Sequence, residues 1–163
     1  TVYLNVSAHT IMHQEFCKIF SRFVEENGIK ENEFGLEITE TAELEDTKKA
    51  GESLERLKKR GIKIALDDFG AGYASLKYIR DLPIDVVKLD RHFTSNISDP
   101  STSRLIKFVS DVCAELNLEM IGEGIETEKE KNMMIELGCV TGQGFLMHMP
   151  SFIEDIKKEN NDG

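Results

Sequence analysis

Short apolar runs alternate with longer amphipathic segments along the chain, and this alternation predicts six strands separated by helices. The short runs have the length and the β-former content of strands, and the longer segments repeat apolar residues at helical spacing. The predicted strands cover residues 2–7, 34–40, 62–68, 84–90, 118–123 and 139–146. The predicted helices cover residues 10–27, 44–60 and 74–81, a segment that opens at 99–101, and residues 127–137 and 151–159. Strands that alternate with helices indicate a parallel sheet covered by helices.

Glycines and capping residues mark several helix ends. Gly28, Gly61 and Gly138 each follow a helical segment, where glycine accepts the left-handed backbone that ends a helix. Thr127 and Glu130 have the spacing of a capping box. We expect the helix phenylalanines and the Met133–Met134 pair to be core residues. In the first helix the expected inward positions are Ile11, Phe16, Ile19, Phe20, Phe23 and Val24.

Two adjacent carboxylates, Asp67 and Asp68, end the apolar strand 62–68, and a glycine-rich turn begins directly after them. Neighbouring carboxylates repel each other and shift each other's pKa, so the pair needs a cation beside it. Hard divalent cations such as Mg²⁺ take oxygen ligands, and this pair is therefore a candidate for a metal site.

Every predicted strand carries a polar, ligand-capable side chain near its carboxyl end. These residues are Asn5, Glu37, Asp67 with Asp68, Lys88, Glu123 and Gln143. An open doubly wound sheet concentrates function at one switch point, whereas a (β/α) barrel gathers all strand ends around one mouth. The pattern therefore favours a TIM-type barrel. Such a barrel has eight strands, so we expect about two strands to be missing before residue 1.

Convergence of the strand ends would place five carboxylates and one lysine in a single pocket, with Glu126 as the fifth acid. Five anions need compensation, which predicts two divalent cations. Paired metals bind a phosphate, generate a hydroxide near neutral pH and stabilise the leaving oxygen in phosphoester hydrolysis. Lys88 could orient or deprotonate the water, or neutralise developing negative charge.

The overall charge narrows the range of partners. The 163 residues include 20 basic and 30 acidic side chains, a formal net charge of −10. This charge argues against a nucleic-acid polymer or an anionic membrane surface as partner. No apolar run approaches the ~20 residues of a membrane span. The three cysteines lack C-x-x-C spacing, and Cys17 and Cys113 fall on apolar helix faces, which predicts small core residues in a reducing, cytoplasmic compartment.

Six motifs in order and at consistent spacing resemble the EAL-domain family of bacterial cyclic di-GMP phosphodiesterases. They are Asn5-Val6-Ser7, Glu37-Ile38-Thr39-Glu40, Asp67 to Tyr73, Lys88-Leu89-Asp90, Glu123 to Thr127 and Gln143-Gly144-Phe145. The resemblance implies a modified TIM barrel that hydrolyses cyclic di-GMP to linear pGpG with Mg²⁺ or Mn²⁺, two ions per site.

The same resemblance implies roles for single residues. Asn5, Glu37 and Asp67 would ligate one metal, and Asp67 would bridge to a second. Asp68 and Glu123 would complete that second site.

Lys88 would contact the catalytic water, with Glu126 and Gln143 supporting the water and the metals. Glu40 would anchor the loop that follows Asp68. That loop, with Phe69, Gly70, Gly72 and Tyr73, and the helix after it are similar to the family's dimerisation and regulatory element, which implies a homodimer.

The resemblance also sets expectations for domain organisation. Residues 1–155 would form a partial EAL domain, which lacks the Glu-Ala-Leu strand that names the family because that strand would lie before residue 1. Residues 156–163 would form a carboxyl-terminal tail. The parent protein would carry an upstream sensor or GGDEF domain, which could anchor it to a membrane. We expect this fragment alone to be inactive or weak. Met149-Pro150 departs from the Arg-Pro that the family often shows.

Structural explanations remain open for several of these residues. Glu37 could pair with a buried lysine, Lys88 could be that structural partner, and Asn5 could satisfy a neighbouring strand. Glu123 and Glu126 could be solvated loop ends, and Gln143 could be structural. His9 and His13 are four apart, but without a third ligand an exposed helix face is favoured over zinc. The alternative function is a degenerate EAL domain that binds cyclic di-GMP or a protein without hydrolysis.

Overall fold

The computed structural model describes residues 1–30, 32–39, 46–71 and 75–152 of the chain. These residues form one six-stranded sheet in the order β1-β2-β3-β4-β5-β6. All neighbouring strands are parallel, which confirms the predicted α/β class. The strands are β1 (Val2–Asn5), β2 (Phe34–Thr39), β3 (Lys63–Phe69), β4 (Val86–Leu89), β5 (Glu119–Gly122) and β6 (Thr141–Gly142).

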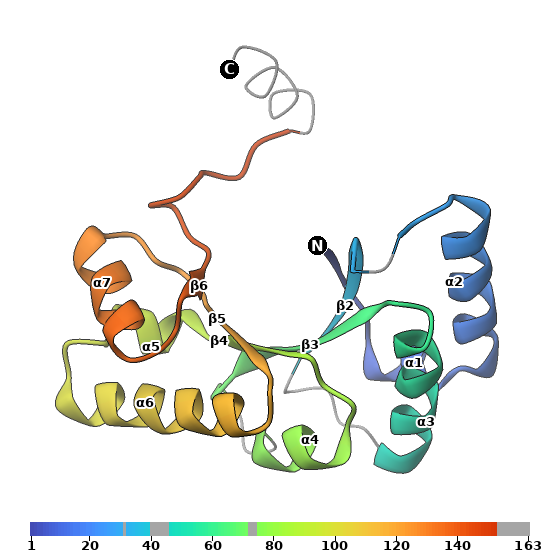
Figure 1. Ribbon diagram of the computed structural model, residues 1–163, viewed down its shortest axis with the longest axis horizontal. Helices are drawn as coiled ribbons and strands as arrows, with labels where there is room; N and C mark the ends of the chain where they lie inside the picture. The colour runs from blue at the N-terminus through green and yellow to red at the C-terminus, as the bar shows by residue number, and fades with distance from the viewer. Residues whose placement is uncertain (31, 40–45, 72–74, 153–163) are drawn as a thin grey trace.

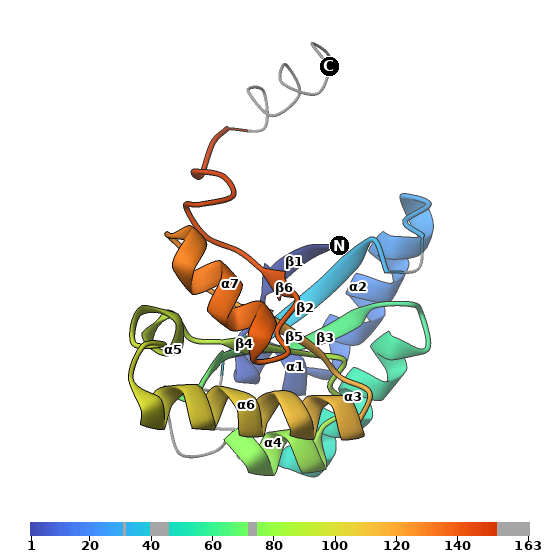
Figure 2. The ribbon, with the colours of Figure 1, turned by 60° about the vertical axis from the view of Figure 1, so that its left-hand side comes forward.

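The helices lie along the outer side of a curved sheet, as in part of a TIM barrel (Figures 1 and 2). They are α1 (Ala8–Met12), α2 (Gln14–Glu26), α3 (Thr47–Lys58), α4 (Ser75–Asp81), α5 (Arg91–Ser95), α6 (Pro100–Glu115) and α7 (Glu128–Glu136). Strands β1 and β6 are the two edges of the sheet, and each pairs with one neighbour among the described residues. The carboxyl ends of all six strands therefore lie along one rim.

The two faces of the sheet differ in composition because alternate residues of a strand point to opposite sides. On the helix side, Leu36, Ile64 and Leu66 are fully buried in the main hydrophobic core. On the inner side a small separate cluster is made by Ala65, Val86 and Ile121, against which Tyr3 packs. The inner face thus has an apolar middle layer, and the polar strand ends lie beyond it.

Several helix ends follow the sequence-based expectations. Gly28, Gly61 and Gly138 have φ angles of +62°, +77° and +97°, the left-handed conformation expected of a glycine that ends a helix. Thr127 and Glu130 form a complete capping box at the start of α7. Cys17 and Cys113 are free and buried, as predicted for core thiols, and Cys139 is free and buried as well.

The predicted element boundaries were wrong at three places. The first helix is two helices, because His13 has an extended backbone (ψ 120°) that separates α1 from α2. Helix α5 was not predicted, and Asp90 caps its amino end by accepting from the His92 amide. The last strand is confined to β6, because the backbone turns away at Gly144.

The predicted helix cores were also partly wrong. Ile19 and Phe23 on α2 are 65% and 45% exposed, and Phe108 on α6 is 54% exposed. Met134 is buried as expected, and Met133 is partly buried. His9 is exposed on α1, in keeping with a plain helix face, and His13 is exposed at the break between α1 and α2. The start of the predicted helix 44–60 and nearly all of the predicted helix 151–159 lie outside the described residues.

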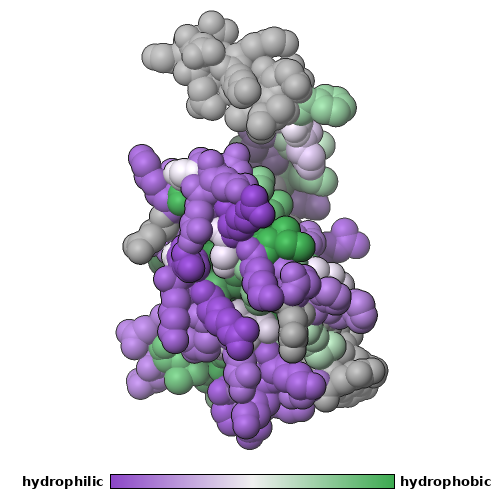
Figure 3. Space-filling view, turned by 90° about the vertical axis from the view of Figure 1, so that its right-hand side faces the viewer, coloured by the Kyte–Doolittle hydropathy of each residue, from purple (hydrophilic) through white to green (hydrophobic). Residues whose placement is uncertain are grey.

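The surface carried by α1, α2 and α3 is predominantly hydrophilic (Figure 3). None of the described helices combines the length and the apolar character required to cross a membrane.

Candidate functional site

A β-bulge brings the two adjacent aspartates to the same rim. Leu66 pairs with Val87 and Phe69 pairs with Leu89, so β3 advances by three residues over a length in which β4 advances by two. Asp68 is the extra residue and has a left-handed backbone (φ +55°). In a regular strand Asp68 would point to the helix side, opposite Asp67. The bulge instead lets both carboxylates serve one site, as bulges beside active sites often do.

Lys88 lies at the centre of this rim and contacts three carboxylates. Its Nζ is 2.7 Å from Glu123 Oε1, 2.8 Å from Glu37 Oε1 and 2.9 Å from Asp67 Oδ1. The ammonium has three N–H donors, so these acceptors match its whole hydrogen-bonding capacity. The Lys88 side chain is only 5% exposed, because β4 is buried on both faces. The sequence left open that Glu37 pairs with a buried lysine, and this is the pairing observed.

The carboxylates around Lys88 keep its ammonium charged. Burial acts against the charge, but hydrogen bonds to Glu123, Glu37 and Asp67 outweigh it and raise the pKa of Lys88 above the ordinary value. Burial raises the pKa of Glu123, and the nearby charges of Asp67 and Asp68 add to this effect. The hydrogen bond from Lys88 acts on Glu123 in the opposite direction.

Three acids offer a ready set of metal ligands. Carboxylate oxygens of Asp67, Asp68 and Glu123 all lie within 4.8 Å of one another. An all-oxygen, three-carboxylate set suits Mg²⁺ or Mn²⁺ by its donor chemistry. Glu37 is joined to this cluster through Lys88, and Asn5 is the register partner of Glu37 on β1. The structure therefore brings together the acids expected to bind metal and places Asn5 beside them.

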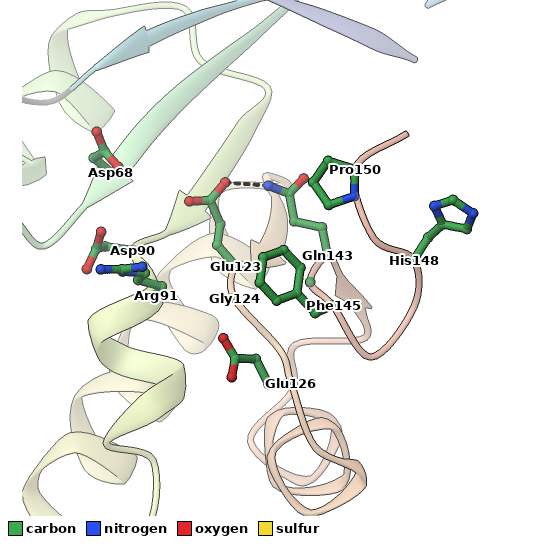
Figure 4. A pocket seen from close by; sticks show the side chains of 11 residues that line it. Asp68, Asp90, Arg91, Glu123, Gly124, Glu126, Gln143, Phe145, His148 and Pro150 are labelled. Carbon is green, nitrogen blue, oxygen red and sulfur yellow. Dashed lines mark hydrogen bonds between the residues drawn. The ribbon is translucent and has the colours of Figure 1, made fainter. Parts of the chain in front are cut away.

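Gln143 and Glu126 reach the site in different ways. Gln143 Nε2 donates to Glu123 Oε1 at 2.7 Å, so the amide orients one candidate ligand (Figure 4). Glu126 lines the same pocket, but its carboxylate lies apart from that of Glu123 and takes no part in the Glu123–Gln143 hydrogen bond (Figure 4). Its backbone N–H donates to Glu130, which fixes the loop and leaves the Glu126 side chain exposed to solvent.

A pocket of about 470 Å³ opens beside these acids. Its walls come from three strand–helix loops and from the segment after β6. The lining residues are Asp68, Asp90, Arg91, Glu123, Gly124, Glu126, Gln143, Gly144, Phe145, His148 and Pro150. Sequence reasoning did not assign a role to Arg91 or His148. Asp90 and Phe145 belong to the sequence motifs that contain Lys88 and Gln143. Their position in these motifs was the sequence feature that could have indicated a place in the pocket.

Two glycines hold the pocket loops at close approach. Gly124 has φ +65°, and a Cβ there would lie 2.6 Å from Arg91 Cβ. A Cβ at Gly144 would lie 2.2 Å from the Ile125 carbonyl oxygen. Because the neighbours are backbone or the base of a side chain, neither contact can be relieved by rotating a side chain. Both positions therefore require glycine.

The loop predicted after Asp68 begins one residue later than expected. Phe69 belongs to β3 and is 4% exposed, because the bulge returns its ring to the helix-side core, so the placement of Phe69 in the loop was wrong. Gly70 follows with φ +97°, and a Cβ there would meet the ring of Phe93. Glu40, Gly72 and Tyr73 lie outside the described residues.

Known proteins with this arrangement carry the same domain. The sequence model of one family, described as the EAL domain, matches residues 1–150. "Probable cyclic di-GMP phosphodiesterase PdeI" of Escherichia coli is 32% identical over 91% of this chain and 19% of its own length. The chain thus spans about a fifth of that relative.

Solved structures agree with the sequence match. The EAL domain of Mycobacterium smegmatis DcpA superimposes with a TM-score of 0.92 at 29% identity, over 99% of this chain and 73% of the other. Klebsiella pneumoniae BlrP1, solved as a complex with manganese and cyclic di-GMP, gives a TM-score of 0.81 at 25% identity, over 88% of this chain and 37% of the other. The chain belongs to the EAL domain family.

Proposed function

We propose that this domain hydrolyses cyclic di-GMP to linear pGpG with the help of divalent metal ions. The observation that carries the proposal is the rim cluster, in which Asp67, Asp68 and Glu123 present oxygens within 4.8 Å of one another around a buried lysine. Membership of the EAL family, and the manganese and cyclic di-GMP reported for BlrP1, support this substrate and this metal class.

The proposed metals are two Mg²⁺ or Mn²⁺ ions. Asn5, Glu37 and Asp67 would hold one, and Asp67, Asp68 and Glu123 the other. When bound, such ions supply a hydroxide nucleophile near neutral pH and offset the charge of the phosphodiester.

The remaining residues position the reactants. Gln143 holds Glu123 through the 2.7 Å hydrogen bond. Glu126 would accept a hydrogen bond from water at the pocket rim, because its carboxylate lies at the pocket wall and is exposed. Lys88 would donate to the attacking water or to the developing phosphorane oxygen once a carboxylate releases one of its N–H groups.

The test is direct conversion of cyclic di-GMP by the purified chain, followed by chromatography of pGpG. We expect a low rate, since the sheet is open at β1 and β6 among the described residues. That rate should require Mg²⁺ or Mn²⁺ and should be lost in Asp67→Asn. Conversion that persists in Asp67→Asn, or in excess EDTA, would contradict the proposal.

A binding module without turnover is the second candidate. The buried Lys88 cage favours it, because a lysine held by three carboxylates is also a stable structural network. Calorimetry that detects cyclic di-GMP binding, with no pGpG after prolonged incubation with Mn²⁺, would support this candidate over hydrolysis.

We also propose that residues 1–155 act as one cytoplasmic domain under an upstream regulatory domain, and that it forms a homodimer. Helix α4 follows the loop after Asp68 and exposes Leu76, which is 57% accessible. Light scattering should show a dimer that Leu76→Ser weakens. A monomer at all concentrations would refute the dimer without affecting the hydrolytic proposal.

A further inference from the structure

The ammonium of Lys88 lies against carboxylates that also belong to the candidate metal cluster. Two of the three carboxylates that Lys88 contacts, Asp67 and Glu123, also belong to the candidate metal cluster. The Lys88 contacts are short, 2.7–2.9 Å, and buried. Among the described residues, Lys88 is the lysine or arginine that forms ion pairs with Glu37, Asp67 and Glu123.

Binding of a divalent ion to the cluster while the ammonium stays in place would be electrostatically unfavourable. Like charges a few ångströms apart repel strongly where solvent screening is weak, and this site is mostly buried. An oxygen that donates a lone pair to the metal also loses much of its capacity to accept from Lys88. The arrival of a metal should therefore weaken or break the contacts of Lys88 to Asp67 and Glu123.

We propose that Lys88 is an internal counterion that occupies the metal cluster in the metal-free protein and is displaced when metal binds. This inference rests on the proposed function, because it concerns the same site. Lys88 holds the carboxylates together while no metal is present. It thereby lowers the affinity of the site for metal, and it becomes available to the reacting groups only when the site is loaded.

A purely structural ion pair makes a different prediction. Such a lysine would keep its three contacts with or without metal, and its removal would loosen the acids and weaken metal binding. The internal counterion predicts the reverse sign, because removing its charge leaves an acidic cluster that attracts metal more strongly.

The first experiment uses calorimetric Mn²⁺ titration of the full chain and three variants. Lys88→Gln should bind Mn²⁺ at least about tenfold more tightly than the wild type, which corresponds to ~1.4 kcal/mol. Lys88→Arg keeps the charge and should gain no affinity. Lys63→Gln is the matched control, because Lys63 pairs with Glu119 at 3.0 Å at the opposite end of the strands. Its affinity should stay within about twofold of wild type.

The second experiment follows Lys88 in the wild-type protein and uses the charge-conserving variant only to assign its signal. Proton–nitrogen NMR of the lysine ammonium groups should show a protected Lys88 signal in the metal-free wild type, identified by its loss in Lys88→Arg. Diamagnetic Mg²⁺ should shift or broaden this signal while the Lys63 signal stays in place.

The outcomes separate the two proposals. Wild-type protein that binds no Mn²⁺ or Mg²⁺ would refute the metal site itself, and with it the proposed function. Metal binding that leaves the Lys88 signal unchanged, or that is equal or weaker in folded Lys88→Gln, would refute the internal counterion alone. Tighter binding in Lys88→Gln together with a moved Lys88 signal would support it.

Discussion

Replacing Asp68 by asparagine should make the metal-free protein more stable. The same substitution should reduce the stabilisation that the protein gains from bound metal. The substitution removes one negative charge from the rim and keeps the size of the side chain. Asparagine also tolerates the left-handed backbone seen at Asp68 (φ +55°). The change therefore tests electrostatics with little effect on the bulge.

The expected size follows from the spacing of the acids. Two negative charges at the 4.8 Å upper limit of the cluster's oxygen separations repel by about 3.5 kcal/mol at an effective dielectric constant of 20. Asp68 faces two such neighbours, Asp67 and Glu123, and Lys88, which contacts both of these neighbours, offsets roughly one of the two repulsions. Solvent screening at the half-buried Asp68 reduces the remainder, so a net gain of ~1–2 kcal/mol is expected in Asp68→Asn.

Thermal unfolding in EDTA measures this gain. In a domain of this size, 1 kcal/mol shifts the Tm by about 2–4 °C, so Asp68→Asn should unfold about 2–8 °C higher than the wild type. Saturating Mn²⁺ should raise the Tm of the wild type and leave the variant nearly unchanged, because the variant has lost a ligand. Asp111→Asn, an exposed substitution on α6, is the control and should shift neither value. A metal-free Asp68→Asn that is less stable than wild type would show that repulsion among the acids is not significant.

Two further predictions concern packing and ionisation. Gly124→Ala should destabilise the protein by ~2 kcal/mol or more in urea titrations, because the new Cβ adds left-handed strain and lies against Arg91 Cβ. The control Gly51→Ala, inside α3, places its Cβ at ordinary contact distance and should be neutral or stabilising. Equal effects of the two substitutions would refute the steric reasoning. Burial raises the pKa of Cys113 and of Cys139 to about 11, so the unfolded chain loses these thiol protons first and the free energy of unfolding should fall as pH rises from about 9 to about 11. Iodoacetamide at pH 8 should alkylate neither thiol until urea is added, and rapid labelling of the native protein would contradict their burial.

The sequence was sufficient for the parts of the structure that follow from periodicity. Parallel β/α alternation puts all strand ends on one rim, so Glu37, Asp67 and Glu123 could be grouped without coordinates. The fold comparison confirms the barrel-like class, and the family comparison confirms the resemblance.

The bulge could not be predicted in the same way. Strict alternation would send Asp68 to the helix side, and the composition of residues 66–69 does not show that one of them is extra. The consequence for Phe69, which returns to the core, was missed for the same reason.

Local patterns also failed where tertiary contacts decide. No proline or glycine marks the break at His13, and apolar residues lie on both sides of it, Ile11 before and Phe16 after, so one long helix was expected. Helical spacing likewise cannot tell which half of a wide apolar arc faces the sheet, and Phe23 and Phe108 lie outward. The cage around Lys88 was only one of several alternatives, because ion pairing between strands depends on register.

Anomalous diffraction from crystals of this chain grown with Mn²⁺ tests the central claim most directly. We predict manganese density bounded by the carboxylates of Asp67, Asp68 and Glu123, at the rim where β3 and β5 end. Density only elsewhere on the molecule, or none at this rim at saturating Mn²⁺, would contradict the proposal that these strand ends form a metal-dependent catalytic site.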